Sequence, residues 1–479
     1  MPAAQRSMTA FALRRRLSAM AAMGALGLGL LIAPAGIANA DPAESTNSTS
    51  TRQAPDSLFP DQGSSRYDVK HYAIKLSYQT SGEIKAKTTV IAKAKKRLTS
   101  FSLDLEGLTV DSVKVNGRNA DYSRRDNKLI IKPSKVLDGR FWVTVKYHGK
   151  PVTHIDPDGS SEGWIPTADG TTTLNEPVGA MTWFPNNNTP RDKATFDMKI
   201  TVPSKLEVAG SGDLKSVWKH DGQETWRWVQ PYQQATYLAM ISIGNYDVYK
   251  STMTTTTGRK LPILSFIEPK LGTQAAARAL IPKAIRFFER RFGPYPFNSA
   301  GIVVKDVGVG YALETQNRPV FDIAEGEVEE LTNVHEWAHQ WYGNSVTLSD
   351  WSDIWLNEGF AAYAEWLWTA SHGGPSTAEQ FRQAYDDPET DWSVTPIVTD
   401  PEQLFDHMVY LRGGMTLEAL RQEVGSRDFF VILRKWAQQN EYGNVSTADF
   451  IALSERVSGE NLDAFFKAWL YTEGRPALS

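Results

Sequence analysis

The chain has 479 residues, of which 41% are hydrophobic and 22% charged, so it is long enough for two or three globular domains with sizeable cores. It contains no cysteine, which excludes disulfide bonds and thiolate metal ligands and leaves His, Asp and Glu to hold any metal. The formal net charge of −4 gives no support to nucleic-acid binding.

The first 40 residues have the pattern of an export signal. Three arginines (14–16) precede an apolar run (17–32), and Ala38-Asn39-Ala40 fits a small-residue cleavage site. The apolar run is short for a membrane span, and a retained anchor is the alternative to cleavage. Cleavage would remove four arginines and no acid, taking the formal charge from −4 to −8. We therefore expect a soluble mature protein, secreted or otherwise extracytoplasmic, with no membrane segment.

A polar stretch and then a strand-like pattern follow the signal. Residues 41–65 are rich in Ser, Thr and Pro, which predicts a flexible linker. From Tyr67 to Gly149, short runs such as "YDVKHYAIKLSY" and "RFWVTVKYHG" alternate apolar and polar residues between Gly, Asn and Asp turns. Similar runs follow at 194–202, 225–229 and 235–246. The pattern predicts an N-terminal antiparallel β domain over 66–255.

After residue 255 the apolar residues take up helical spacing, which predicts a mainly helical second domain over 256–479. Ser446 is expected to cap one of its helices, with Asp449 at the third helical position. The fold class is therefore multidomain α and β. Helices are predicted at 273–293, 328–342, 352–370, 376–385, 412–424, 427–439, 447–457 and 462–471.

The sequence "NVHEWAHQW" carries the strongest chemical signal in this second domain. His335 and His339 are four residues apart, so a helix presents both imidazoles on one face. A helical H-E-x-x-H offers two nitrogen ligands to zinc, with Glu336 as the base that activates water. The alternative is a pair of surface histidines that happen to share a helix face.

Glu358, in "LNEGF", completes a plausible ligand set. Eighteen residues separate it from His339, and the helix that carries the two histidines is largely apolar, with Trp337, Ala338, Trp341 and Tyr342. A set of two histidines and one glutamate leaves the fourth zinc position open, as in catalytic rather than structural sites. The chain is therefore expected to bind one zinc ion through His335, His339 and Glu358.

Residues 333–363 resemble the zinc segment of the aminopeptidase N family of gluzincin metallopeptidases. The resemblance rests on "HEWAHQWYGNSVT", on "WLNEGFA" and on the interval between them. It implies a β domain followed by a thermolysin-like catalytic domain, and a zinc-dependent enzyme that hydrolyses N-terminal residues from peptides with a free N-terminus. In that family Glu336 would be the general base.

Three further segments match the family in the expected order. "GYALETQ" resembles its exopeptidase motif G-A-M-E-N and places Glu314 on the acid that binds the substrate's α-ammonium. "EPVGAMTWFP" resembles the loop with the second amine-binding group, at Glu176, although this loop read alone favours a surface glutamate. "VYLRGG" resembles the segment with the oxyanion-stabilising tyrosine, at Tyr410, which read alone is an ordinary core tyrosine.

The chain also departs from the family pattern. Tyr311, Leu313 and Thr315 replace the usual residues of the exopeptidase motif, so the preference for the first substrate side chain could differ. "FPNNNTP" stands where relatives have "FPCxDEP". The sequence finishes at "WLYTEGRPALS", where the catalytic domain of larger members ends, so the resemblance implies a short form without their C-terminal helical domain.

Two rival functions remain open at this level. An open site could make the protein a zinc endopeptidase, and a decayed site would leave a catalytically inactive binding protein. Asp353 is placed where it could orient a ligand histidine, but its position favours an acid at a helix N-terminus. The oligomeric state and the preferred substrate residue are not predicted.

Overall fold

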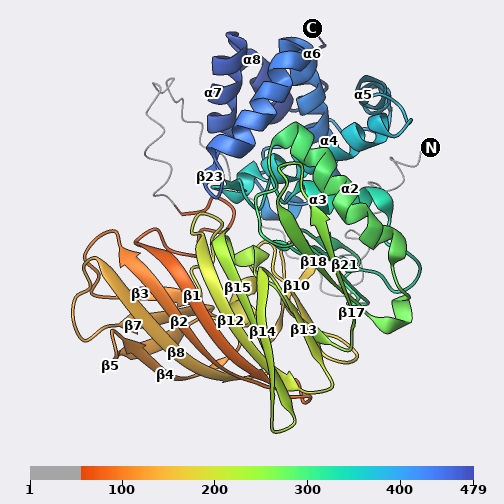
Figure 1. Cartoon of the computed structure of the whole chain (residues 1–479). Helices are drawn as coiled ribbons and strands as arrows, with labels where there is room; N and C mark the ends of the chain where they lie inside the picture. The colour runs from red at the N-terminus through yellow and green to blue at the C-terminus, as the bar shows by residue number, and fades with distance from the viewer. Residues whose placement is uncertain (1–54, 479) are drawn as a thin grey trace, which may run out of the picture.

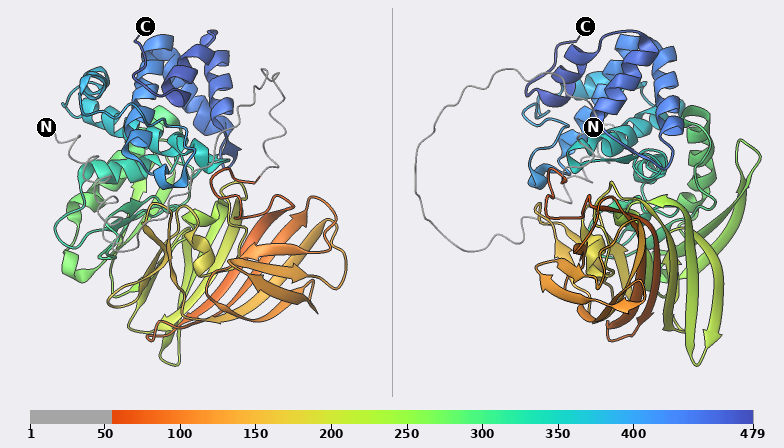
Figure 2. Two further views of the ribbon diagram at one scale, coloured as in Figure 1. Left: turned by 180° about the vertical axis from the view of Figure 1, so that it is seen from behind. Right: turned by 90° about the vertical axis from the view of Figure 1, so that its left-hand side faces the viewer.

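The structure is a computed structural model that describes residues 55–478. The predicted export signal, residues 1–40, and residues 41–54 of the predicted linker lie outside the described residues, and both stay predictions. A β-rich half, coloured orange to yellow-green, lies on one side of the molecule, and a helical half, green to blue, lies on the other (Figures 1 and 2). No helix in the described part of the chain is both long and apolar enough to cross a membrane.

The β-rich half is built on an eight-stranded sheet with the order β14–β15–β12–β1–β2–β8–β4–β5. Neighbouring strands are antiparallel except β1 and β12, which pair in parallel. Alternate residues of β12 are buried, as expected when one face of a strand packs on a core. The strands are β1 Tyr67–Tyr78, β2 Ile84–Ala94, β4 Thr109–Val115, β5 Arg118–Asn119, β8 Arg140–Gly149, β12 Ala194–Pro203, β14 Asp213–His220 and β15 Gln223–Gln234.

Two smaller sheets complete this half. One has three strands in the order β3–β7–β6, and the other has five in the order β13–β16–β11–β10–β9. The predicted strand at 235–246 is wrong in part: a 3-10 turn, η3 (Thr236–Leu238), precedes a shorter β16. The strands are β3 Phe101–Asp104, β6 Asp121–Arg125, β7 Lys128–Lys132, β9 Thr153–Ile155, β10 Ser161–Pro166, β11 Thr171–Leu174, β13 Glu207–Gly210 and β16 Ile241–Gly244.

A further five-stranded sheet introduces the second half, in the order β17–β18–β19–β21–β20. The predicted domain boundary at residue 255 falls in the turn between its first two strands, which pair directly. β20, one of its two edge strands, leads directly to Glu314. The strands are β17 Asp247–Thr254, β18 Lys260–Ile267, β19 Val303–Lys305, β20 Ala312–Leu313 and β21 Val320–Asp322.

The helices follow the predicted order, with differences at their ends. The predicted helices at 412–424 and 427–439 form one span, α6, broken at Gly425, whose φ of 79° is left-handed. Ser446 and Asp449 cap α7 reciprocally, which confirms the predicted cap. A two-stranded pair, β22 (Thr347–Leu348) and β23 (Asn444–Val445), joins distant parts of this half. The helices are α2 Ala275–Phe292, α3 Glu330–Ala338, α4 Trp355–Ser371, α5 Thr377–Asp386, α6 His407–Gln439, α7 Thr447–Ser458 and α8 Asp463–Phe466.

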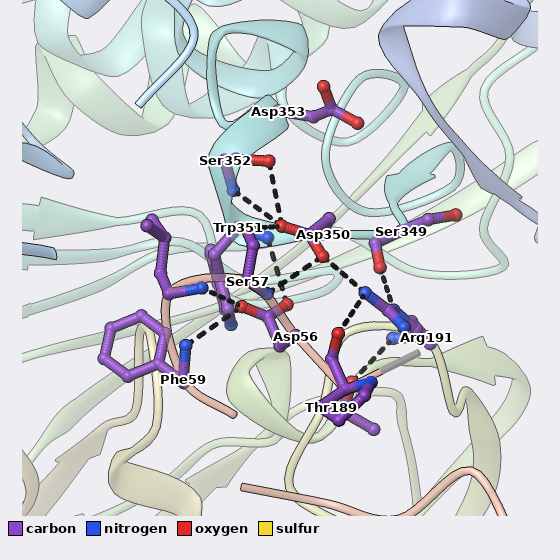
Figure 3. A network of polar contacts seen from close by, with 12 residues as sticks. Asp56, Ser57, Phe59, Thr189, Arg191, Ser349, Asp350, Trp351, Ser352 and Asp353 are labelled. Atoms are coloured by element: carbon purple, nitrogen blue, oxygen red, sulfur yellow. Dashed lines mark hydrogen bonds and ion pairs between the residues drawn. The ribbon is translucent and has the colours of Figure 1, made fainter. Parts of the chain in front are cut away.

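The segment before β1 docks on the helical half rather than forming a flexible linker throughout (Figure 3). Asp56 is buried, and its carboxylate accepts hydrogen bonds from the backbone N–H groups of Leu58 (3.1 Å) and Trp351 (3.1 Å). The Ser57 N–H donates to Asp350, 3.1 Å away. The prediction of flexibility is therefore wrong for residues 55–59, because these few polar groups find partners nearly 300 residues away that composition does not reveal.

Candidate active site

Helices α3 and α4 bring the three predicted metal ligands together. His335 lies in α3, and His339 is the first residue after the end of that helix. The centroids of the two imidazole rings are 4.7 Å apart. Glu358 lies in the first turn of α4, with its Oε2 3.2 Å from His335 Nε2 and 3.5 Å from His339 Nε2. One ligand atom from each residue lies within 4.8 Å of the other two. All three side chains are buried.

The other ring nitrogen of each histidine is already engaged. His335 Nδ1 is 2.7 Å from Glu365 Oε1, and His339 Nδ1 is 3.0 Å from the Tyr342 carbonyl oxygen. These acceptors hold the Nδ1 protons, so the two Nε2 atoms, which both face Glu358, are the nitrogens that would bind a metal. A donor set of two imidazoles and one carboxylate fits zinc.

Glu365, rather than Asp353, orients a ligand histidine. The Asp353 carboxylate instead accepts a 2.6 Å hydrogen bond from the Thr447 hydroxyl, at the start of α7. Sequence reasoning missed Glu365. Since it follows Glu358 by seven residues, two helical turns, both project from the same face of α4, and that spacing could have identified it.

The electrostatics of this donor set follow from its burial. Burial disfavours every charge here, but the two histidines hold the pKa of Glu358 below its ordinary value. Burial lowers the pKa of His335, yet its bonds to Glu358 and Glu365 raise that pKa well above the usual range. A buried carboxylate held against two imidazoles therefore favours the binding of a cation.

Glu336 lies beside the metal ligands without being one of the facing triad. Its side chain is buried, and its Oε2 has no hydrogen-bond partner among the described residues. Burial raises the pKa of Glu336 to about 8, against the opposing influence of His335 and His339. A buried carboxylate with a free oxygen and a raised pKa has the properties of a general base.

Glu314 lies immediately after the edge strand β20, close to the same cluster. An oxygen of Glu314, one of Glu336 and a nitrogen of His339 lie within 4.8 Å of one another. Its backbone carbonyl accepts hydrogen bonds from Gln340 Nε2 (3.1 Å) and Asn344 Nδ2 (2.6 Å). Its Oε1 is buried and has no hydrogen-bond partner within the described part of the chain, and burial raises the pKa of this carboxyl.

Glu176 joins Glu314 at this site, which corrects the reading of its loop as a surface feature. Oxygens of Glu176, Glu314 and Glu358 lie within 4.8 Å of one another, and Glu176 is only 4% exposed. The loop is buried because its backbone is tied down: the Val178 N–H donates to the Glu162 carboxylate at 3.2 Å, and the Val178 carbonyl accepts from Asn188. Such distant partners cannot be read from the loop's own sequence.

Tyr410 comes from α6 and faces the first ligand. Its ring lies 6.0 Å from the His335 ring, tilted by 29°. Helices α4 and α6 approach closely because Gly359 of α4 and Gly413 of α6 meet without side chains. A Cβ on Gly413 would lie 2.8 Å from Gly359 Cα. This contact places Glu358, next to Gly359, and Tyr410, one turn before Gly413, on the same side of the site.

Tyr237, from η3, was not predicted as a site residue. It is buried, and its hydroxyl lies 3.3 Å from both Asn357 Nδ2 and the Gly343 carbonyl. Burial and the charges of Glu314, Glu176 and Glu358 raise its pKa well above 10. It was missed because the surrounding sequence was predicted to be a strand.

Comparisons with known proteins find relatives of both halves of the chain. The Peptidase M1 N-terminal domain matches residues 68–238 and the Peptidase family M1 domain matches residues 320–469. Relatives include "Probable aminopeptidase 2" of Sulfurisphaera tokodaii, 26% identical with 78% of this chain and 50% of that protein covered, and "Aminopeptidase N" of Streptomyces lividans, 26% identical with 85% and 50% covered. The chain thus spans about half the length of the curated relatives it matches.

Solved structures match over most of the chain. An M1 zinc metallopeptidase from Deinococcus radiodurans superposes with a TM-score of 0.80 at 27% identity, covering 88% of this chain and 99% of that one. A mutant of it bound to a Tyr-Ser-Ala substrate gives a TM-score of 0.82 at 28% identity, with 88% and 98% covered. With both family domains matched in order and a zinc donor set between α3 and α4, the chain belongs to peptidase family M1.

Proposed function

We propose that this protein is a zinc-dependent aminopeptidase that removes N-terminal residues from peptides. The observation that carries the proposal is the position of two carboxylates, Glu176 and Glu314, within 4.8 Å of the ligand Glu358. Two buried acids facing one point, with no lysine or arginine ion-paired to Glu314 among the described residues, favour a cationic ligand. A peptide's free α-ammonium is such a cation, and its capture would place the first peptide bond beside the residues that would hold the metal.

Each remaining residue has a role in this reaction. His335, His339 and Glu358 would hold a zinc ion, which would supply a Lewis acid at the reacting carbonyl. Glu336 takes a proton from the attacking water and passes it to the leaving amine. Tyr410 donates a hydrogen bond to the oxyanion as negative charge develops there. Glu365 keeps His335 in the tautomer that binds metal.

The aminopeptidases and zinc metallopeptidases similar to this chain support the proposal, and digestion of an unstructured peptide tests it. Mass spectrometry should show residues lost one at a time from a free N-terminus, and no loss from the N-acetylated form. Internal cleavage of both forms would instead favour the zinc endopeptidase. Bound zinc without hydrolysis of either peptide would favour the inactive binding protein.

A further inference from the structure

A buried lysine of the β-rich half reaches across the junction between the two halves. Lys193, just before β12, is 6% exposed. Its Nζ donates to three backbone carbonyls of the helical half: Asn344 at 2.9 Å, Ser345 at 2.8 Å and Gly443 at 3.4 Å. No carboxylate lies within ion-pair distance of Lys193 in the described part of the chain. Its partners are therefore backbone oxygens alone.

The first of these carbonyls belongs to the residue that holds Glu314. Asn344 donates from its side chain to the Glu314 backbone carbonyl at 2.6 Å, and its own N–H donates to the His339 carbonyl at 3.0 Å. Lys193 thus fixes the backbone of Asn344 while the Asn344 amide fixes Glu314. The contacts form a short chain from the β-rich half to the amine-binding acid.

We propose that Lys193 is a positioning residue that sets the place of Glu314, and so the affinity for a substrate's amino terminus, through Asn344. The proposal rests on the proposed aminopeptidase function. It gives the β-rich half a part in substrate binding beyond the Glu176 loop. Glu314 directly follows β20, which lies at an edge of its sheet and pairs only with β21 within the described sheet.

The chemistry of the contact favours a lysine. Three carbonyl oxygens converge on one nitrogen, and an ammonium has one N–H for each of them. Burial lowers the pKa of Lys193 to about 7 because no nearby acid offsets it. Burying an amine without a carboxylate partner costs free energy of folding. The three hydrogen bonds of Lys193 offset part of that cost and hold the three carbonyls in one arrangement.

The test compares KM and kcat in variants of the zinc-loaded full chain. Lys193→Met keeps the length of the side chain and removes every N–H donor. With the best aminoacyl 4-nitroanilide of a panel, we expect KM to rise about tenfold, kcat to stay within about threefold and the zinc content to be unchanged. Asn344→Ala should raise KM to a similar degree, because it removes the last contact of the chain.

A double-mutant cycle then separates positioning from general structural support. If Lys193 acts through Asn344, the double variant should have a KM within about twofold of Asn344→Ala alone. Independent effects, giving about a hundredfold rise, would overturn the proposal. An unchanged KM in Lys193→Met would also overturn the proposal. If Lys193→Met does not fold, Lys193→Gln, whose side chain is shorter and neutral, replaces it, and an unchanged KM in that variant would overturn the proposal in the same way.

Arg191 provides the matched control. It belongs to the same loop and also crosses the junction, but it donates to the Ser349 carbonyl and the Asp350 carboxylate rather than to the Asn344 carbonyl that Lys193 binds (Figure 3). Arg191→Met should lower the melting temperature and leave KM within about twofold. An equal KM rise in this control would assign the effect to loosening of the junction and refute a specific role for Lys193. Equal hydrolysis of free-amine and N-acetylated substrates by the wild-type enzyme would instead refute the proposed function itself.

Discussion

Glu365 lies 2.7 Å from the Nδ1 atom of His335, on the side of the ring opposite the metal-binding nitrogen. The two residues are 30 positions apart and belong to adjacent helices, α3 and α4. Because α4 also carries Glu358, a single helix supplies one ligand directly and orients another. The relative placement of α3 and α4 therefore sets the geometry of the whole donor set.

Glu365→Gln should weaken zinc binding by about 10- to 100-fold, because an amide is a weaker acceptor that polarises the His335 ring less. Chelator competition measures the dissociation constant, and excess zinc should restore much of the activity. Asp353→Asn is the matched control, since Asp353 bonds Thr447 and not a ligand. Equal zinc affinity in the wild type and Glu365→Gln would contradict the orienting role.

Glu336→Gln should retain zinc and lose most of its turnover, because all three ligands remain and only the proton acceptor is removed. A fall in kcat of about 10²- to 10⁴-fold is expected for loss of a general base. The zinc content and the kcat of Glu336→Gln, measured on the same preparation, test this expectation. Loss of the metal together with activity would mean that Glu336 acts as a ligand.

Part of this site could be predicted from the sequence and part could not. His335, His339 and Glu358 follow from helical periodicity, because residues four apart on one helix must share a face. Glu176, Tyr237 and Lys193 owe their positions to packing between the two halves, and no local pattern records which distant backbone groups a loop will meet. Glu365 is an intermediate case. The sequence shows its seven-residue spacing from Glu358, but it does not show that His335 is its partner.

The fold shows the same division. The alternation of β1 and β12 predicted strands, but not that these two strands pair in parallel, since order within a sheet depends on long-range contacts. The predicted helix at 328–342 ends early, at Ala338, because the chain turns there: the Gly343 N–H donates to the Val346 carbonyl at 2.7 Å. Lys193 bonds this same turn, through the Asn344 and Ser345 carbonyls.

The contact between Gly359 and Gly413 predicts a sharp difference between two neighbouring substitutions. Gly413→Ala would place a Cβ 2.8 Å from Gly359 Cα and should destabilise the fold by roughly 1–3 kcal/mol, moving Tyr410 and lowering kcat. Gly414→Ala meets nothing closer than 3.6 Å and should be tolerated or mildly stabilising. Melting temperatures and kcat of both variants check this. Similar losses in both would show that the helix contact is not the cause.

The docked N-terminal segment predicts a pH-dependent difference in stability. Burial, and then the charge of Asp350, raises the pKa of Asp56 to about 6 from 3.8. A raised folded pKa gives a stabilising contribution that is present below the unfolded pKa and is lost as pH rises through the folded pKa. The melting temperature of the wild type minus that of Asp56→Asn should therefore fall between about pH 4 and pH 6 and then level off. A difference that is constant or rises over this range would contradict the assignment.

In the proposed aminopeptidase, Glu314 is expected to restrict hydrolysis to substrates with a free amino terminus. The most direct measurement is kcat/KM of Glu314→Gln against wild type on a free-amine aminoacyl 4-nitroanilide, with zinc content determined in both. Removing one partner of a buried charge pair predicts a loss of about 30-fold or more at unchanged zinc content. Wild-type kcat/KM in Glu314→Gln, with N-acetylated substrate hydrolysed equally well by both, would contradict the account.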